Sequence, residues 1–362
     1  MFGETATQND MDRDNTQNIS SKRDAEKEMV KGFVEHCAKY QKASYYNALF
    51  QLANTLIPFF IICGIMLYSF STAYWVTALL TIPAVGLLVR IFIIQHDCGH
   101  GSFFPSRKWN NRVGRIMSLF TWTPYDFWRK THNMHHSASG NLDGRGFGAI
   151  ETITVAEYEA LDSKMKFWYR IYRNPYIMLL LGNPYFIIVG QRFPIVNPLP
   201  FFETDKSISP KQIYKSVFGL DIALIAFFGG LGFVFGFGTV LLAYLPIVLI
   251  TAWLGGWLFY VQHQFEDSYW ERQDKWDYSQ AAVLGSSYYD LHPILQWFTG
   301  NIGLHHIHHL NAKIPNYRLQ ECMDDEPSLR KINRITLLES FKLRKLRLWD
   351  EKQSKMVNNF PA

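Results

Sequence analysis

The chain has 362 residues, of which 48% are hydrophobic, 16% aromatic and 19% charged. This composition excludes an intrinsically disordered chain and a collagenous one. The four cysteines lie far apart without a CxxC pair, which argues against a disulfide framework and against a cysteine zinc site. The twelve histidines are unusual, because ten of them fall within four short stretches.

The first 25 residues are polar and predict a disordered tail. No apolar core follows a basic start in this region, so we expect no cleaved signal peptide. From residue 26 to about residue 46, apolar side chains such as Val30, Phe33 and Cys37 recur at steps of three and four. This spacing predicts an amphipathic helix, which either lies on a membrane surface or packs on the rest of the protein.

Four apolar blocks follow, each long enough to cross a hydrocarbon core as a helix of about 20 residues; they are residues 48–70, 76–95, 217–238 and 241–261. Very short turns join the blocks in pairs, so we expect two helical hairpins. Arg90 lies near the end of the second block, and we expect it to extend toward lipid headgroups rather than to bind a carboxylate or ester. Pro175–Val189 is apolar but short and broken by Pro184, which predicts an interfacial or re-entrant segment.

Lys and Arg indicate the orientation, because cytoplasmic loops hold the excess of these residues. Residues 1–47 contain 7 of them, residues 97–215 contain 15 and residues 263–362 contain 13, whereas the two short turns contain none. We therefore expect an all-helical, multi-pass protein of the plasma membrane with both termini in the cytoplasm. A membrane domain would cover residues 26–350, with a cytoplasmic helical cap at 97–215 and 263–350, and residues 351–362 would be a C-terminal tail.

The net charge of +5 is better explained by anionic lipid headgroups and an acidic soluble partner than by nucleic acid. The basic stretch Arg330–Arg347 also carries regularly spaced apolar residues. It predicts either a segment lying on anionic lipid or a helix packed on the cap.

The clustered histidines recur mainly at steps of three and four residues, and all of them fall on the cytoplasmic side of the deduced topology; they are His96, His100, His132, His135, His136, His263, His305, His306, His308 and His309. On a helix, residues at i and i+4 have Cβ atoms about 5–6 Å apart, close enough to bind one metal ion or two neighbouring ones. A single histidine usually has no such role, but three clusters on one side of the membrane predict metal binding.

Imidazole ligands suit zinc, copper, iron and nickel. A structural zinc site closes at four ligands and a catalytic one commonly uses three, so eight or nine histidines are too many for one zinc ion and indicate two metals. Two redox-active irons held in this way would suit oxidation of an unactivated C–H bond, which ordinary side chains cannot perform. Acyl chains in the bilayer supply such bonds.

The pattern HxxxH, HxxHH and HxxHH resembles the histidine boxes of the membrane fatty acid desaturases. The similarity is greatest to bacterial acyl-lipid desaturases of the delta-5 and delta-12 kind, which act on phospholipids. It rests on the boxes together with Arg90–Phe104, Asn141–Asp143, Tyr260–Trp270 and Thr299–Leu310. The resemblance covers about residues 45–350.

This resemblance implies that eight box histidines bind two iron ions, namely His96, His100, His132, His135, His136, His305, His308 and His309. It also implies His263 as an additional ligand. His306 either replaces a box ligand or forms a hydrogen bond beside one. Acyl-CoA desaturases place an asparagine one turn before the ligand on the fourth helix, and Phe259 departs from that pattern here.

Carboxylates near the boxes would orient the imidazoles. The candidates in sequence are Asp97, Asp143, Glu266 and Asp267. Alternatively, Asp97 caps a helix end, and Glu266 and Asp267 form a solvated face.

The function implied by the resemblance is the introduction of a cis double bond, of the delta-5 type, into acyl chains of membrane phospholipids with O2 as co-substrate. A separate ferredoxin or flavodoxin would supply electrons. Two alternatives remain open at this stage. One is a related di-iron hydroxylase or ketolase acting on fatty acids, alkanes or carotenoids, although the alkane hydroxylase signature NYxEHYG is missing. The other is a metal-binding or lipid-sensing membrane protein without turnover.

Overall fold

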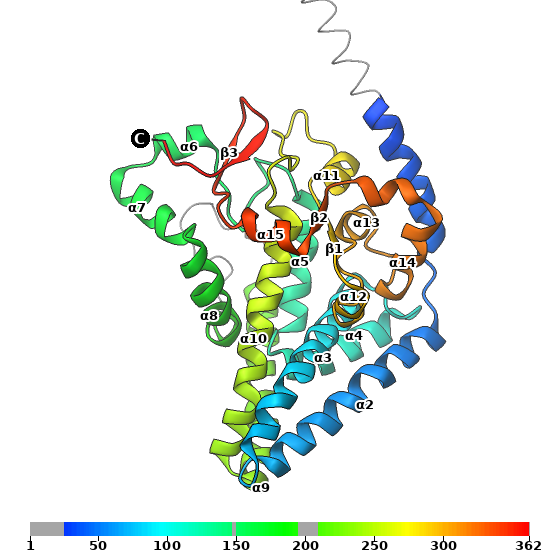
Figure 1. The fold of residues 1–362 in the computed structure, drawn as a ribbon, viewed down its shortest axis with the longest axis vertical. Helices are drawn as coiled ribbons and strands as arrows, with labels where there is room; N and C mark the ends of the chain where they lie inside the picture. The colour runs from blue at the N-terminus through cyan, green and yellow to red at the C-terminus, as the bar shows by residue number, and fades with distance from the viewer. Residues whose placement is uncertain (1–24, 147–149, 195–208, 362) are drawn as a thin grey trace, which may run out of the picture.

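The computed structural model describes residues 25–146, 150–194 and 209–361. Helices make up most of the described chain, and Figure 1 shows a lower stem of long helices beneath an upper cap of shorter helices and strands. The described chain begins and ends in the cap.

Four helices build the stem: α2 (Tyr45–Ser69), α3 (Tyr74–His100), α9 (Pro210–Phe235) and α10 (Phe237–His263). Each contains 25 to 27 residues. At 1.5 Å per residue they are about 38–40 Å long, more than a hydrocarbon core of about 30 Å. All four are long and apolar enough to cross a membrane, which confirms the predicted all-helical membrane fold.

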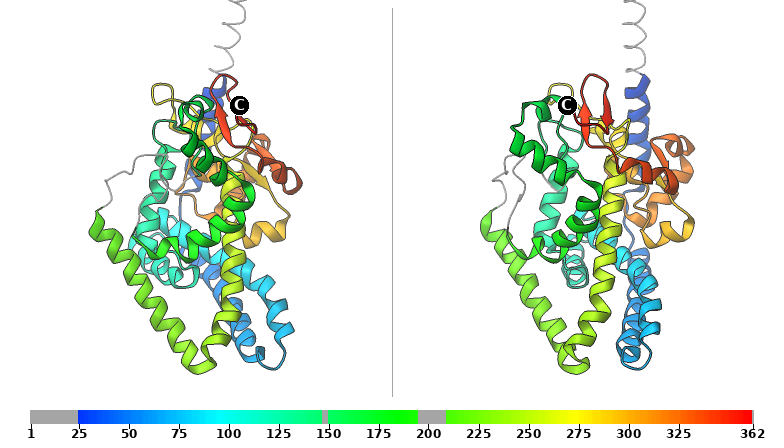
Figure 2. Two further views of the ribbon diagram at one scale, coloured as in Figure 1. Left: turned by 90° about the vertical axis from the view of Figure 1, so that its left-hand side faces the viewer. Right: turned by 60° about the vertical axis from the view of Figure 1, so that its left-hand side comes forward.

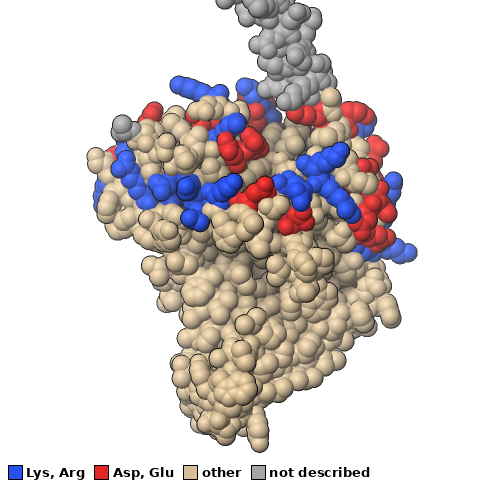
Figure 3. Space-filling model, in the orientation of Figure 1, with Lys and Arg blue, Asp and Glu red and all other residues tan. Residues whose placement is uncertain are grey.

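Helix α3 is the central element of the stem. In its most apolar window 56% of the residues are buried, against 22% for α2 and 17% for α9. It packs against α2, α4 and α10, and its side chains Leu88, Ile91 and Ile94 lie in the largest apolar core. The outer faces of α2 and α9 therefore remain apolar and exposed, and the stem surface in Figure 3 carries no charged side chains. Such a surface is suited to contact with lipid rather than with water.

Short connections join neighbouring stem helices at the end away from the cap (Figures 1 and 2). Residues 70–73 link α2 to α3, and Gly236 alone links α9 to α10. Gly236 has a φ of 89°, a conformation that a residue with a Cβ atom rarely adopts. This glycine allows α10 to begin directly after α9 ends.

The cap surrounds the upper ends of α3 and α10. Its N-terminal part contains α4 (Arg107–Thr121), α5 (Tyr125–Ala138), α6 (Val155–Ala160), α7 (Ser163–Tyr172), η2 (Ile177–Gly182), α8 (Asn183–Ile188) and η3 (Gly190–Arg192). Its C-terminal part contains α11 (Tyr278–Leu284), α12 (Pro293–Phe298), α13 (His305–Leu310), α14 (Asn316–Asp325), η4 (Pro327–Lys331) and α15 (Leu337–Leu343).

Two small two-stranded sheets lie in the cap. Strand β1 (Tyr288–Asp290) is parallel to β2 (Arg334–Thr336), with Tyr289 opposite Ile335. Strand β3 (Leu348–Asp350) is antiparallel to β4 (Lys355–Val357), with Trp349 opposite Met356. We expected residues 351–362 to form a tail. Their described part instead contributes β4, and pairing with β3 buries Met356 at 2% exposure.

The N-terminal amphipathic helix packs on the cap. Of the two predictions for this segment, the structure therefore favours a helix packed on the rest of the protein over one lying on a membrane surface. Helical residues 25–37 lead into η1 (Ala38–Tyr40). Their buried side chains Val30, Phe33 and Cys37 share an apolar core with Leu319 of α14.

Two other segments that the sequence analysis singled out consist of short elements. Pro175–Val189 forms η2 and α8, too short to span a membrane, and Leu181 and Tyr185 are 66% and 63% exposed. Arg330–Arg347 is not a single helix: it forms the end of η4, then β2, then α15. Asn333, with a φ of 43°, lies in the turn between η4 and β2.

Arg90 does not extend toward headgroups as expected. Its side chain is buried, its Nε donates to Thr55 Oγ1 at 3.1 Å, and a second guanidinium nitrogen donates to the backbone oxygen of Trp297. The guanidinium also lies 4.2 Å from the centroid of the Trp297 ring. This cation–π contact and the two acceptors replace the headgroup contact, because α12 covers the residue.

Candidate metal centre

The first histidine pair lies on the last turn and a half of α3. The helix continues beyond the predicted end of the second block and stops at Gly101, whose φ of 76° provides a left-handed C-cap. His96 and His100 therefore lie on one face, with ring centroids 4.7 Å apart. The predicted i, i+4 geometry is present.

The second cluster lies on α5, which crosses close to the end of α3. The ring of Trp128, one turn before His132, stacks on the His132 ring at 4.6 Å and an interplanar angle of 14°. His135 and His136 follow on the same helix and are buried. Trp128 thereby closes one side of the cluster.

The third cluster forms most of α13, a helix of six residues in which every residue is buried. A tight turn with positive φ at Gly300 and Asn301 precedes it. His263, the last residue of α10, faces this helix: its Nε2 lies 3.0 Å from Nε2 of His305.

These elements bring nine histidines into two adjacent groups. In the first group, five histidines have nitrogen atoms within 4.8 Å of one another: His96, His100, His132, His136 and His308. In the second group, three do so: His135, His263 and His309. His305 lies at the edge of the second group. The stacked rings of His136 and His309, with centroids 4.0 Å apart, link the two groups.

The distances between nitrogens fit ligands of a common metal ion. Nε2 of His136 lies 3.2 Å from Nε2 of both His132 and His308. In the second group, Nε2 of His263 lies 3.1 Å from Nε2 of His135. Two imidazoles bound to one ion at about 2.1 Å and at right angles would have their nitrogens about 3.0 Å apart.

The protonation state of the imidazoles also suits a metal. Burial lowers the pKa of the cluster histidines on α5 and α13, so they are neutral at pH 7 and keep a free lone pair; these are His132, His135, His136, His305, His308 and His309. Nδ1 of His263 lies 3.3 Å from the backbone oxygen of Gly285, which leaves its Nε2 as the acceptor. Nε2 of His100 and Nε2 of His309 are buried and have no hydrogen-bond partner among the described residues. A metal ion would satisfy these atoms.

Asp97 is the one predicted carboxylate that contacts a clustered histidine within the described chain. Its Oδ1 lies 2.9 Å from Nδ1 of His96, and its side chain is 1% exposed. A carboxylate on Nδ1 fixes the tautomer in which Nε2 carries the lone pair. The same carboxylate also binds the first backbone N–H of α14, so the alternative role as a helix cap applies as well.

The remaining predicted carboxylates lie in ion pairs. Asp143 binds Arg272 at 2.9 Å, and the exposed Glu266 and Asp267 lie 3.7 and 3.4 Å from Lys355. These three residues are close to the boxes in sequence, but their carboxylates pair with arginine or lysine side chains and not with the clustered histidines.

His306 points away from both groups. Its ring is fully buried, and its Nε2 lies 3.1 Å from the backbone oxygen of Leu329. It therefore joins α13 to η4.

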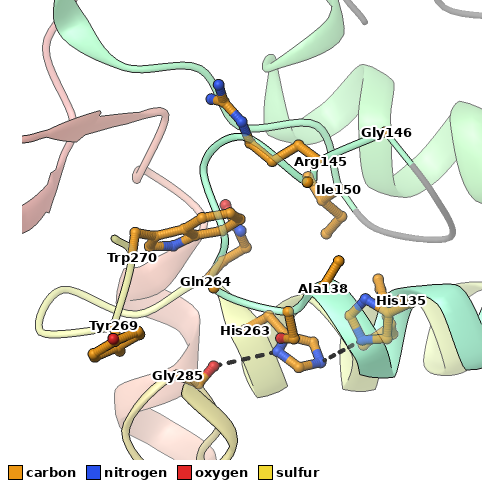
Figure 4. A pocket seen from close by; sticks show the side chains of 14 residues that line it. His135, Ala138, Arg145, Gly146, Ile150, His263, Gln264, Tyr269, Trp270 and Gly285 are labelled. Atoms are coloured by element: carbon orange, nitrogen blue, oxygen red, sulfur yellow. Dashed lines mark hydrogen bonds between the residues drawn. The ribbon is translucent and has the colours of Figure 1, made fainter. Parts of the chain in front are cut away.

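A pocket of about 460 Å³, counting the part open to solvent, leads to the second group. His135 and His263 line it side by side, and Gln264 and Trp270 also line it (Figure 4). Phe259, at the position that departs from the acyl-CoA desaturase pattern, lines the same pocket.

Three contributors were missed by the sequence analysis. Trp128 could have been found from its position four residues before His132. Asn316, which binds Asp97, and the backbone oxygen of Gly285 gave no signal, because their partners are distant in the sequence or the contact is made by the main chain.

Comparison with known proteins agrees with this site. The family model described as fatty acid desaturase matches residues 42–333. A fatty acid desaturase of Bacillus subtilis (strain 168) is 40% identical over 328 residues, which cover 91% of this chain and 90% of the relative.

Two further relatives align over a smaller part of the chain. The sn-1 acyl-lipid omega-3 desaturase (ferredoxin) of Synechocystis is 29% identical over 66% of this chain and 64% of the relative. The acyl-lipid omega-3 desaturase (cytochrome b5) of Arabidopsis thaliana is 29% identical over 65% of this chain and 60% of the relative. With its membrane helices and histidine groups, the chain belongs to the fatty acid desaturase family and is an oxidoreductase.

Proposed function

We propose that the protein introduces a cis double bond into acyl chains of membrane phospholipids, using O2 and two electrons at a di-iron centre. The observation that carries this proposal is the convergence of imidazoles, all but His100 in the buried class, into two groups at one end of the apolar stem helices. The acyl-lipid desaturases among the relatives support a lipid-bound substrate.

The first iron would be held by His96, His100, His132, His136 and His308, and the second by His135, His263 and His309, with His305 beside them. When bound, the two irons supply the O2-dependent oxidation of an unactivated C–H bond. The chain itself orients His96 through Asp97. It orients His263 through the Gly285 oxygen, and it covers one side of the first group by stacking Trp128 on His132.

The two groups differ in whether the pocket reaches them. The pocket in Figure 4 is lined by His135 and His263, and none of the residues lining it belongs to the first group. Because the first group has five imidazoles and the second has three, the second ion has more room for an exogenous ligand. We infer that small molecules and protons reach the centre from this pocket.

Orientation in the membrane is part of the proposal. Lys and Arg side chains form a row where the apolar stem meets the cap (Figure 3). Such residues are concentrated on the cytoplasmic side of membrane proteins. We infer that the cap faces the cytoplasm beneath the plasma membrane and that residues 26–350 form the membrane domain.

The electron donor follows from the relatives and the charge. Cyanobacterial relatives are named for ferredoxin and the Arabidopsis relative for cytochrome b5. We propose a separate ferredoxin or flavodoxin, since an acidic carrier complements a chain of net charge +5. Turnover by the purified protein with each reduced carrier, at low and high salt, tests this choice.

Expression in a host without desaturases tests the function. Gas chromatography with mass spectrometry of derivatised lipids should find new cis-monounsaturated chains, and we expect the double bond at the delta-5 position. His308→Ala should abolish these products. His292→Ala is its matched control and should keep them, because His292 caps α12 by accepting a 3.3 Å hydrogen bond from the Ile294 N–H and lies outside both histidine groups. Hydroxylated products, or bound iron with an unchanged lipid profile, would overturn the proposal.

A further inference from the structure

The carboxylate that binds His96 is itself held from its other side. Oδ2 of Asp97 accepts two hydrogen bonds from Asn316, one from the backbone N–H at 2.6 Å and one from the side-chain Nδ2 at 2.9 Å. Both side chains are 1% exposed. Both oxygens of this buried carboxylate are therefore occupied, one by the imidazole and the other by asparagine.

Asn316 is fixed in turn by the stem. Nε2 of Gln51, on α2 and 2% exposed, donates to Oδ1 of Asn316 at 2.9 Å. Since this bond occupies the amide oxygen, the amide of Asn316 is oriented with its NH₂ group toward Asp97. Asn301 Nδ2 also donates to the backbone oxygen of Asn316 at 3.2 Å. The resulting chain runs from Gln51 through Asn316 and Asp97 to His96.

We propose that Asn316 is a positioning residue of the metal centre, acting through Asp97 and oriented by Gln51. Asn316 holds the Asp97 carboxylate in the position where this carboxylate accepts a hydrogen bond from Nδ1–H of His96. That hydrogen bond directs Nε2 of His96 into the first histidine group. The inference rests on the proposed function only in taking that group as a metal site. Removing partners of this kind typically weakens metal binding or activity about 10- to 100-fold.

A purely structural role is the alternative, because Asn316 is the first residue of α14 and Asp97 caps that helix through the backbone N–H. Asn316→Ala separates the two roles. Alanine keeps the N–H that binds Asp97, so the cap remains, but it removes the Nδ2 donor. If capping were the whole role, the metal affinity of the alanine variant would equal that of the wild type.

The experiment measures Co²⁺ affinity of the full-length protein in detergent, by competition with a chelator and by the visible absorption of bound Co²⁺. We expect Asn316→Ala to weaken binding about 10-fold and Asp97→Ala to weaken it about 10- to 100-fold. The double variant should bind no more weakly than Asp97→Ala alone, since Asn316 acts only through Asp97. Wild-type affinity in Asn316→Ala, or fully additive losses in the double variant, would overturn the inference.

Two further variants make the test robust. Asn110→Ala is the matched control, because Asn110 is also a buried asparagine but its amide binds the backbone of Phe104; its Co²⁺ affinity should equal that of the wild type. Gln51→Met leaves α14 and Asp97 intact if Asn316→Ala fails to fold. It should weaken Co²⁺ binding and shift the absorption band, and wild-type behaviour would again overturn the inference.

The inference and the proposed function can fail separately. A wild-type protein that binds Co²⁺ through this chain but makes no unsaturated lipid would refute only the function. Normal desaturation with unchanged affinity in Asn316→Ala would refute only the positioning role.

Discussion

His306 provides a sharp test of the difference between a metal ligand and a structural histidine, because it lies next to His305 in the same box. Its imidazole is fully buried, with Nε2 3.1 Å from the Leu329 oxygen. In His306→Ala, the Leu329 oxygen loses its partner, which costs about 1–3 kcal/mol, and a cavity remains. We expect the free energy of unfolding to fall by about 2–4 kcal/mol.

The metal and the reaction should survive this change. We expect His306→Ala, assayed well below its unfolding temperature, to keep the iron content and the activity per folded molecule of the wild type. His308→Ala on the same short helix is the comparison, because Nε2 of His308 lies 3.2 Å from Nε2 of His136 in the first group. It should lose iron and product. Thermal unfolding, iron analysis and lipid profiling measure these effects, and loss of iron with unchanged stability in His306→Ala would refute the assignment.

The pH dependence of stability gives a second measure of the same residue. Burial lowers the pKa of His306 to about 4, whereas it is about 6.5 in the unfolded chain. Between these values the unfolded chain binds a proton that the folded chain does not. Stability is therefore fully present above pH 6.5 and falls as the pH drops toward 4, by about 2 kcal/mol at pH 5. His306→Gln should lose this contribution and show a flatter profile in unfolding experiments from pH 7 to 5, and an unchanged slope would contradict the reasoning.

Three further predictions concern the site and its support. His135→Ala should abolish product while leaving membrane insertion intact, as measured by lipid profiling and membrane fractionation; full activity would count against the second group. Ala138→Leu should narrow the pocket beside His135 and lower the turnover rate severalfold at unchanged iron content, and wild-type turnover would mean that this pocket is not the entry route. A Cβ atom on Gly86 would lie 2.5 Å from Phe298 of α12, so Gly86→Val should cost about 1–3 kcal/mol; unchanged thermal stability would show that α12 can shift freely.

The stem could be predicted from sequence because its signal is local. Each apolar block is continuous, and each predicted range falls largely within one helix; residues 76–95 and 241–261 lie wholly inside α3 and α10, whereas 48–70 and 217–238 run one and three residues past the ends of α2 and α9. The end of α3 was predicted too early, at Gln95, because polar residues follow. The polar side chains at this end of the helix are buried and form hydrogen bonds with distant residues. Gln95 accepts a hydrogen bond from Thr121 at 2.5 Å, and Asp97 accepts one from Asn316. Such partners cannot be identified from one sequence.

The cap was less predictable, because its short elements depend on partners distant in the chain. Arg90, which α12 of the cap covers, is an example: one of its two acceptors and the aromatic ring that it contacts both belong to Trp297, 207 residues away. The segment Arg330–Arg347 did contain a usable local signal. Thr336 and Glu339 form a capping box at the start of α15, and the spacing T-x-x-E predicts a helix that begins there rather than one that runs through.

The division of the boxes between the two histidine groups follows from helical geometry. Successive residues of an α-helix point about 100° apart, so residues at i and i+4 share a face and consecutive residues do not. His132 and His136 accordingly fall in the first group while His135 falls in the second, and on α13 His308 and His309 separate in the same way. An HxxHH frame on one helix therefore cannot serve a single ion with all of its imidazoles. Two such frames facing each other, with one HxxxH pair and one histidine added, produce two neighbouring histidine groups of unequal size.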